Sequence, residues 1–134
     1  MPSDTRAAAL AMLARRALSE MELRQRLTQK GYTDIDDTVL RIKDLGYLND
    51  QALAEALARE AERTGRGPLW LANKLRQRGV RAKPPIPDQE TLLLRAKAAL
   101  SKRFAQLAAA DKPRAYRFLL SRGFTTDIAS QLLR

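Results

Sequence analysis

The stretch SEMELRQRLTQKGY, residues 19–32, decides the fold predicted for this chain. Ser19 followed by Glu22 is a capping box, in which each side chain accepts a hydrogen bond from the other residue's backbone amide at a helix start. Leu23 and Leu27 are four residues apart, so they lie on one helix face and form an apolar stripe. Gly31 ends the helix, because glycine reaches the left-handed backbone conformation without a Cβ clash. The stretch therefore predicts a short amphipathic helix with both ends marked.

Two further stretches repeat this frame, GPLWLANKLRQRGV at 67–80 and DKPRAYRFLLSRGF at 111–124. Gly67 and Asp111 are acceptable N-cap residues, and Pro68 suits a first helical position, where no backbone amide is needed. The closing glycines are 48 and then 44 residues apart, which leaves room for three helices in each repeat. The apolar stripes of these two frames are Leu71 with Leu75, and Ala115 with Leu119.

Helical patterns also flank each frame. We expect Thr33 to cap a helix that Gly46 ends, and Thr125 to cap the last helix. The expected flanking helices cover about residues 5–17, 34–45, 49–63 and 88–110, and the segment after Thr125. Their expected inward-facing residues are Leu10, Leu13, Ala14, Ala17, Val39, Ile42, Leu45, Ala52, Leu53, Ala56, Leu57, Ala61, Ile128, Ala129 and Leu132.

The stretch RAKPPIP, residues 81–87, interrupts the pattern. Three prolines in four residues exclude a regular helix there, so the stretch is either a linker or a degraded third helix. The chain is therefore predicted to be all-α, with three tandem three-helix repeats at 1–48, 49–87 and 88–134.

Positive charge recurs on the frame helices. The chain carries a formal net charge of +10 over 134 residues, which points to a polyanionic partner. A cation stands one residue before each closing glycine. Another stands five residues before it in the first two frames, where the third frame has Phe118. The two positions are four residues apart and are therefore neighbours on a helix surface. Cations in a last helical turn also complement the helix dipole, which is the plain structural alternative. The predicted basic surface comprises Arg15, Arg16, Arg24, Arg26, Lys30, Arg66, Lys74, Arg76, Arg78, Arg117 and Arg122.

Signals for an enzyme are weak. The chain has no Cys and no His, which removes the commonest metal ligands and the commonest general base. A nuclease could hold Mg²⁺ with Asp34, Asp36 and Asp37, but acidic residues are ordinary at a helix N-terminus. Arg and Gln at residues 24–29 leave open a helix that reads duplex DNA. We expect a protein that is not an enzyme and uses no metal or cofactor.

The motifs together resemble the RecX family of bacterial recombination regulators. The resemblance is carried by residues 13–16 with the first frame, by Leu45–Asp50, and by Arg66–Pro68 with the second frame. A weaker match follows at Phe118–Phe124. The first two repeats keep the family's order and spacing, whereas residues 81–87 depart from it.

The resemblance implies a curved, elongated array of three-helix repeats with a basic face. Family members bind in the groove of the RecA–DNA filament and inhibit strand exchange, ATP hydrolysis and co-protease activity. The resemblance therefore predicts RecA as the partner, with weak, sequence-independent binding of single- and double-stranded DNA, by a monomer. The first 16 residues lack the apolar core of a signal peptide and no run is long enough for a membrane span, so we expect a cytoplasmic protein without membrane contact.

Overall fold

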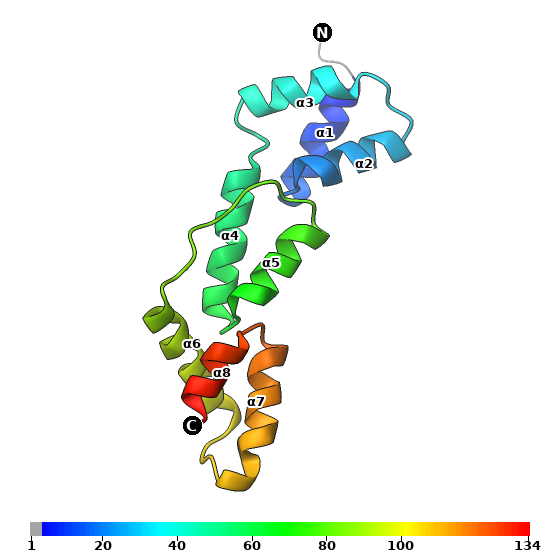
Figure 1. Cartoon of the computed structure of the whole chain (residues 1–134). Helices are drawn as coiled ribbons and strands as arrows, with labels where there is room; N and C mark the ends of the chain where they lie inside the picture. Colours follow the sequence, from blue (N-terminus) through cyan, green and yellow to red (C-terminus); the bar gives the residue numbers. More distant parts are fainter. Residues whose placement is uncertain (1–3) are drawn as a thin grey trace. The chain divides into compact units, whose positions relative to one another are not determined.

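The computed structural model describes residues 4–134, and all regular elements in that range are helices, without a β-strand (Figure 1). The predicted all-α class is confirmed. The helices are α1 (Asp4–Arg15), α2 (Glu20–Gln29), α3 (Ile35–Asp44), α4 (Asp50–Arg63), α5 (Pro68–Gln77), α6 (Gln89–Arg103), a short 3-10 turn (Ala109–Asp111), α7 (Lys112–Ser121) and α8 (Thr126–Leu132).

The chain divides into two compact units. The N-terminal unit comprises the residues up to Glu55 together with Leu75–Pro84, and the C-terminal unit comprises Ala56–Lys74 together with Pro85–Arg134. Both units therefore draw on α4 and on α5. The boundaries of the three repeats at residues 48 and 87, and the curvature of the array, stay predictions. The predicted first repeat begins at residue 1, and residues 1–3 lie outside the described range.

Helices α1, α2 and α3 form a three-helix bundle in the N-terminal unit (Figure 1). The capping box is confirmed: the Ser19 hydroxyl accepts from the Glu22 amide at 3.0 Å, and the Glu22 carboxylate accepts from the Ser19 amide at 2.9 Å. Gly31 and Gly46 have φ of 87° and 83°, which confirms them as helix ends. The buried core of this bundle is Ala9, Leu18, Leu23, Leu27, Val39, Ile42 and Leu48.

Helices α6, α7 and α8 form a second three-helix bundle in the C-terminal unit. The turn between α7 and α8 follows the predicted frame, because Gly123 has a φ of 93° and Phe124 is fully buried. Thr125 caps α8 as predicted, its hydroxyl accepting from the Ile128 amide at 3.3 Å. The buried core is Leu92, Ala96, Leu100, Ala115, Leu119, Phe124, Ile128 and Ala129.

No helix follows α5 at the place where a third helix of the middle repeat would stand. Residues 80–88 are irregular, as the three prolines predicted. This segment is tied to the start of α4 within the N-terminal unit: the Arg81 amide donates to the Asp50 carboxylate at 3.0 Å, and Gln51 donates to the Lys83 carbonyl at 3.2 Å. The prolines therefore replace a packed helix with an irregular segment held by hydrogen bonds.

The long helix predicted to reach residue 110 ends at Arg103 instead. Phe104 leaves the helix with φ −125° and ψ 107°. Its ring meets Phe118 edge-on, with the ring centroids 5.9 Å apart. Burial of this aromatic pair against the bundle core outweighs the helix preference of the Ala-rich residues that follow.

One predicted cap is wrong, and another stands at its predicted position without a capping hydrogen bond. Helix α3 begins after Asp34 rather than after Thr33, and Asp34 makes no capping hydrogen bond, because its carboxylate accepts from the Thr5 hydroxyl. Asp111 does precede α7, but its side chain does not cap the helix. The Asp111 carboxylate instead pairs with Arg114 at 3.4 Å.

Some residues expected to face inward are exposed. Leu45 is 49% exposed, and Ala14, Ala17, Ala52 and Ala56 are exposed as well. The buried face of α4 runs through Leu53, Ala54, Leu57 and Ala61. Helix α5 has no fully buried residue, and its stripe residues Leu71 and Leu75 are half-buried. The middle repeat lacks the third helix that would cover this stripe.

Candidate functional site

Four of the predicted basic residues gather around one hollow of about 390 Å³ in the N-terminal unit. Arg15 and Arg16 come from the end of α1, and Arg26 and Lys30 come from the end of α2. All four residues are exposed. The other lining residues are Met12 and Gln29, so no carboxylate is part of the wall. We call Arg15, Arg16, Arg26 and Lys30 the basic cluster.

Helix geometry explains how the basic cluster forms. Arg26 and Lys30 are four residues apart, so they share one face of the last turn of α2. Arg15 is the last residue of α1, and Arg16 follows it directly. The ends of both helices carry a partial negative charge, which stabilises cations placed there and offsets part of their mutual repulsion.

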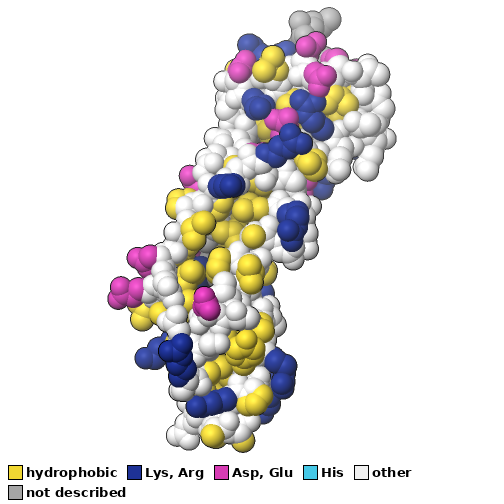
Figure 2. Space-filling view, viewed as in Figure 1, with side chains coloured by type: hydrophobic (Ala, Val, Ile, Leu, Met, Phe, Trp, Pro, Cys, Tyr) yellow, Lys and Arg dark blue, Asp and Glu magenta, His cyan; other side chains and the backbone are white. Residues whose placement is uncertain are grey.

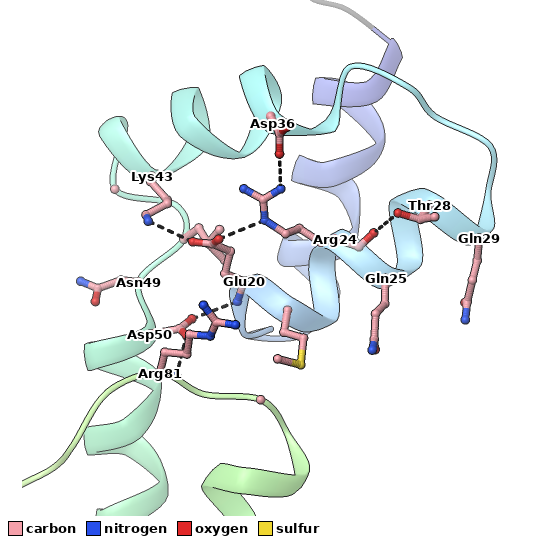
Figure 3. A pocket seen from close by; sticks show the side chains of 14 residues that line it. Glu20, Arg24, Gln25, Thr28, Gln29, Asp36, Lys43, Asn49, Asp50 and Arg81 are labelled. Atoms are coloured by element: carbon pink, nitrogen blue, oxygen red, sulfur yellow. Dashed lines mark hydrogen bonds and ion pairs between the residues drawn. The ribbon is translucent and has the colours of Figure 1, made fainter.

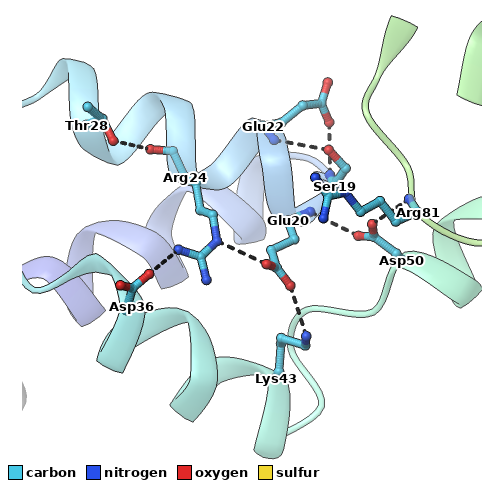
Figure 4. Close-up of polar contacts among 9 residues, drawn as sticks. All are labelled: Ser19, Glu20, Glu22, Arg24, Thr28, Asp36, Lys43, Asp50 and Arg81. Atoms are coloured by element: carbon cyan, nitrogen blue, oxygen red, sulfur yellow. Dashed lines mark hydrogen bonds and ion pairs between the residues drawn. The ribbon is translucent and has the colours of Figure 1, made fainter. Parts of the chain in front are cut away.

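Arg24 lies on α2 but outside the basic cluster, in a network of opposite charges (Figure 4). Its guanidinium donates to Glu20 at 3.0 Å and also to Asp36, and Lys43 meets Glu20 at 2.9 Å. The hydrogen bond from Lys43 lowers the pKa of Glu20, against the effect of burial and with help from Arg24. Hydrogen bonds to Asp36 and Glu20 raise the pKa of Arg24. Carboxylates therefore neutralise much of this charge.

The same network forms part of the wall of a larger hollow, of about 1120 Å³, in the N-terminal unit (Figure 3). Gln25, Thr28 and Gln29 of α2 line another part of it. Cations and carboxylates alternate along this wall and bind one another. In the view of Figure 2, Lys and Arg side chains of the N-terminal unit likewise lie beside Asp and Glu side chains. This hollow therefore lacks the one-sided charge of the basic cluster.

Arg78 holds two segments of the N-terminal unit together. Its guanidinium donates to the Glu22 carboxylate at 2.9 and 3.2 Å and to the Ala17 carbonyl at 2.8 Å. Its own carbonyl accepts from the Ser19 hydroxyl at 2.6 Å. Burial raises the pKa of Glu22. The hydrogen bonds from Arg78 and from the Ser19 amide lower it by more, so the pKa of Glu22 is below its ordinary value. The Arg78 side chain is only 12% exposed, which gives it a structural role.

The remaining predicted cations are spread over α5 and the C-terminal unit. Arg66 and Lys74 lie over the Trp70 ring, 5.2 and 5.9 Å from its centroid. Arg76 and Arg117 are exposed. Arg122 is half-buried and donates to the Thr64 carbonyl.

Two of the three acidic residues at the start of α3 bind other side chains of the protein. Asp34 accepts from Thr5, and Asp36 pairs with Arg24. Within residues 4–134, no group of three or more Asp, Glu, His or Cys side chains is placed to hold a metal ion. In the same range, each helix is too short or too polar to cross a bilayer.

The structure also gathers a group of cations in the C-terminal unit, four of which are not part of the predicted basic surface. Arg63, Arg95, Lys102 and Arg103 line a hollow of about 570 Å³ in the C-terminal unit, together with Arg122. A signal was present in the sequence, since Arg95 and Lys102 are seven residues apart and so lie on one face of a helix.

Comparison with known proteins gives a consistent result over both units. The family model described as RecX, first three-helix domain, matches residues 6–41, and the model described as RecX, second three-helix domain, matches residues 49–83. The regulatory protein RecX of Halorhodospira halophila is 35% identical over 131 residues, which is 91% of this chain and 81% of that protein. The regulatory protein RecX of Thermus thermophilus is 34% identical over 139 residues, covering 100% of this chain and 93% of that protein.

The fold agrees with a solved structure. The crystal structure of RecX from Lactobacillus salivarius superposes with a TM-score of 0.77 at 19% identity, covering 96% of this chain and 94% of that one. With two family domains matched in order and relatives more than 30% identical over most of their length, the chain belongs to the RecX family of regulatory proteins.

Proposed function

We propose that this chain binds the RecA–DNA filament and inhibits strand exchange, ATP hydrolysis and co-protease activity, without catalysing a reaction itself. Family membership supports the choice of partner. The observation that carries the proposal is the basic cluster, where Arg15, Arg16, Arg26 and Lys30 surround a hollow that no carboxylate lines.

The chemistry of the basic cluster suits a filament of protein and nucleic acid. A guanidinium binds a phosphate or a carboxylate through two parallel hydrogen bonds, whereas an ammonium acts as a compact point charge. Three guanidinium groups and one ammonium group can therefore engage a DNA backbone or an acidic protein face. Neither contact depends on the base sequence.

The proposed mechanism is competition for the filament groove. Cations that occupy the phosphate-binding positions of the groove exclude the second DNA strand. Binding to free single- or double-stranded DNA is then weak and sequence-independent, and it falls steeply with salt. The chain acts as a monomer, in the cytoplasm where the recombinase works.

The test measures ATP hydrolysis by RecA on single-stranded DNA as the chain is added. We compare the native chain with a variant of the basic cluster, R15Q/R16Q/R26Q/K30Q. The matched control is R41Q/R59Q/K83Q/K97Q, which removes four exposed cations that do not line the hollow. We expect the native chain and the control to inhibit alike, and the cluster variant to need at least about tenfold more protein.

Three outcomes would contradict the proposal. The native chain could leave ATP hydrolysis unchanged at a stoichiometric ratio to RecA, which would remove the recombinase as a partner. Strong duplex binding that depends on DNA sequence would instead favour a DNA-binding regulator that acts alone. Equal loss of inhibition in both variants would show that total charge matters and the basic cluster does not.

A further inference from the structure

The C-terminal unit contains a second hollow, with a different lining from that of the basic cluster. Its volume is about 570 Å³, and it lies between the end of α4, one face of α6 and the end of α7. Arg63, Arg95, Lys102, Arg103 and Arg122 contribute five cations to its wall, against a single carboxylate, Glu62.

The wall of this hollow combines one face of α6 with several small residues. Thr91, Arg95, Ala98 and Lys102 recur at three- and four-residue steps and so share one face of α6. Ala98, Ala99 and Gly65 leave space between the longer cationic side chains. A Cβ built on Gly65 would stand 3.6 Å from the Ala99 side chain and 3.9 Å from the Arg122 guanidinium, so these groups line the hollow at ordinary contact distance.

Two of the arginines are held in position by the protein. Arg95 donates to the Arg66 carbonyl at 3.1 Å, and Arg122 donates to the Thr64 carbonyl. A side chain fixed in this way loses little conformational entropy when a ligand binds. The hollow is therefore partly preorganised.

The positive charge of Arg122 is also poorly compensated within the protein. Its Nε atom is buried and has no hydrogen-bond partner. Burial, with a contribution from the neighbouring Arg66, lowers the pKa of Arg122. Glu62 is the only carboxylate in a wall with five cations, so an anion in this hollow would offset the cost of desolvation and reduce the repulsion.

We propose that this hollow is a phosphate-binding site. A phosphate group presents several strong acceptor oxygens and as many as two negative charges, which matches fixed arginines better than a single carboxylate does. Phe118 adds an apolar wall on one side. In Figure 2, the lower end of the C-terminal unit likewise shows Lys and Arg side chains beside hydrophobic ones. The phosphate belongs to a free nucleotide or to a nucleic-acid backbone, and the test separates these sources.

This site is independent of the proposed inhibition of RecA. None of the four residues of the basic cluster lines it, and it lies in the other compact unit. Its test therefore needs only the purified chain, and its failure would leave the filament proposal untouched.

The experiment titrates the full chain with inorganic pyrophosphate, followed by calorimetry. The variant R63Q/K102Q/R103Q removes the three exposed cations of the wall and keeps the two arginines that bond to the backbone. The matched control K97Q/K112Q/R134Q removes three exposed cations of the same unit that do not line the hollow. We expect one pyrophosphate to bind per native chain, with affinity reduced at least about tenfold in the wall variant and about twofold or less in the control.

Two further titrations identify the source. ADP binding more tightly than pyrophosphate would assign the site to a free nucleotide, and displacement of pyrophosphate by a short oligothymidylate would assign it to a backbone. Circular dichroism checks that each variant is folded, and the single change Lys102→Glu replaces the triple variant if that one fails to fold. The proposal is overturned if none of the three probes binds, or if the control loses as much affinity as the wall variant.

Discussion

Replacing Gly67 with alanine should destabilise the C-terminal unit more than an ordinary glycine substitution does. Gly67 is buried where the start of α5 meets the turn between α7 and α8. A Cβ built on Gly67 would lie 2.4 Å from the Gly123 carbonyl oxygen, 2.5 Å from its carbon and 2.6 Å from the Phe124 nitrogen. All three are backbone atoms, so no side chain can rotate away to make room.

The size of the effect follows from the contacts that must open. Ordinary contact begins at 3.4 Å, so the two backbone segments must separate by about 1 Å, a shift that a packed interior resists. Two hydrogen bonds would be stretched, Gly67 amide to Arg122 carbonyl and Leu69 amide to Gly123 carbonyl, both now 2.9 Å. Their loss costs about 1 kcal/mol each, and overpacking adds about 1–3 kcal/mol. We expect a total loss of about 3–5 kcal/mol in the free energy of unfolding.

Gly65→Ala is the matched control, two residues away in the same turn. Gly65 has a φ of 66°, but its built Cβ meets nothing closer than 3.6 Å, so alanine there costs only the left-handed conformation, about 1–2 kcal/mol. Urea unfolding is followed by the fluorescence of Trp70, the only tryptophan of the chain, which packs against Gly123. A Gly67→Ala variant no less stable than Gly65→Ala would refute the close backbone contact.

Three further predictions concern the N-terminal unit, each measured by urea unfolding with circular dichroism. Leu27→Ala, at a fully buried position, should cost about 2–5 kcal/mol, whereas Leu40→Ala, at a position 61% exposed, should change stability by less than about 0.5 kcal/mol. Ser19→Ala should cost about 1–3 kcal/mol, because it removes the helix cap and the bond to Arg78; a neutral effect would argue against both contacts. In the folded protein the pKa of Glu22 is below its ordinary value of 4.5. The stabilising effect of the Glu22 carboxylate is therefore complete above pH 4.5 and is lost as the pH falls through the folded pKa. Glu22→Gln should weaken the pH dependence of the free energy of unfolding between about pH 6 and pH 3.

The frame helices could be predicted because their determinants are local. The capping box of Ser19 and Glu22 and the glycine ends at Gly31 and Gly123 depend on residues within a few positions of one another. The end of α6 could not be predicted in this way. Residues 105–110 favour a helix by composition, but α6 ends at Arg103, where Phe104 turns to contact Phe118, which is distant in sequence.

The candidate site was less accessible to sequence reasoning. The predicted basic surface included Arg26 by its spacing from Gly31 and added Arg24 from the same helix. Which of them is neutralised depends on where Asp36 and Glu20 lie after packing. Arg78 illustrates the same difficulty, because its partner Glu22 is 56 residues away. Helix periodicity predicts which face a charge occupies, and tertiary contacts decide whether that charge is available to a partner.

The discontinuous make-up of the N-terminal unit has a consequence for biosynthesis. A chain emerging from the ribosome presents α1, α2 and α3 long before it presents Leu75–Pro84, the segment that completes the same unit. Until that segment is synthesised, Ser19 and Glu22 lack their hydrogen bonds with Arg78, and Asp50 lacks its hydrogen bond from the Arg81 amide. The nascent N-terminal bundle therefore lacks these contacts while residues 56–74 are translated. A fragment cut at residue 48 would lack them permanently.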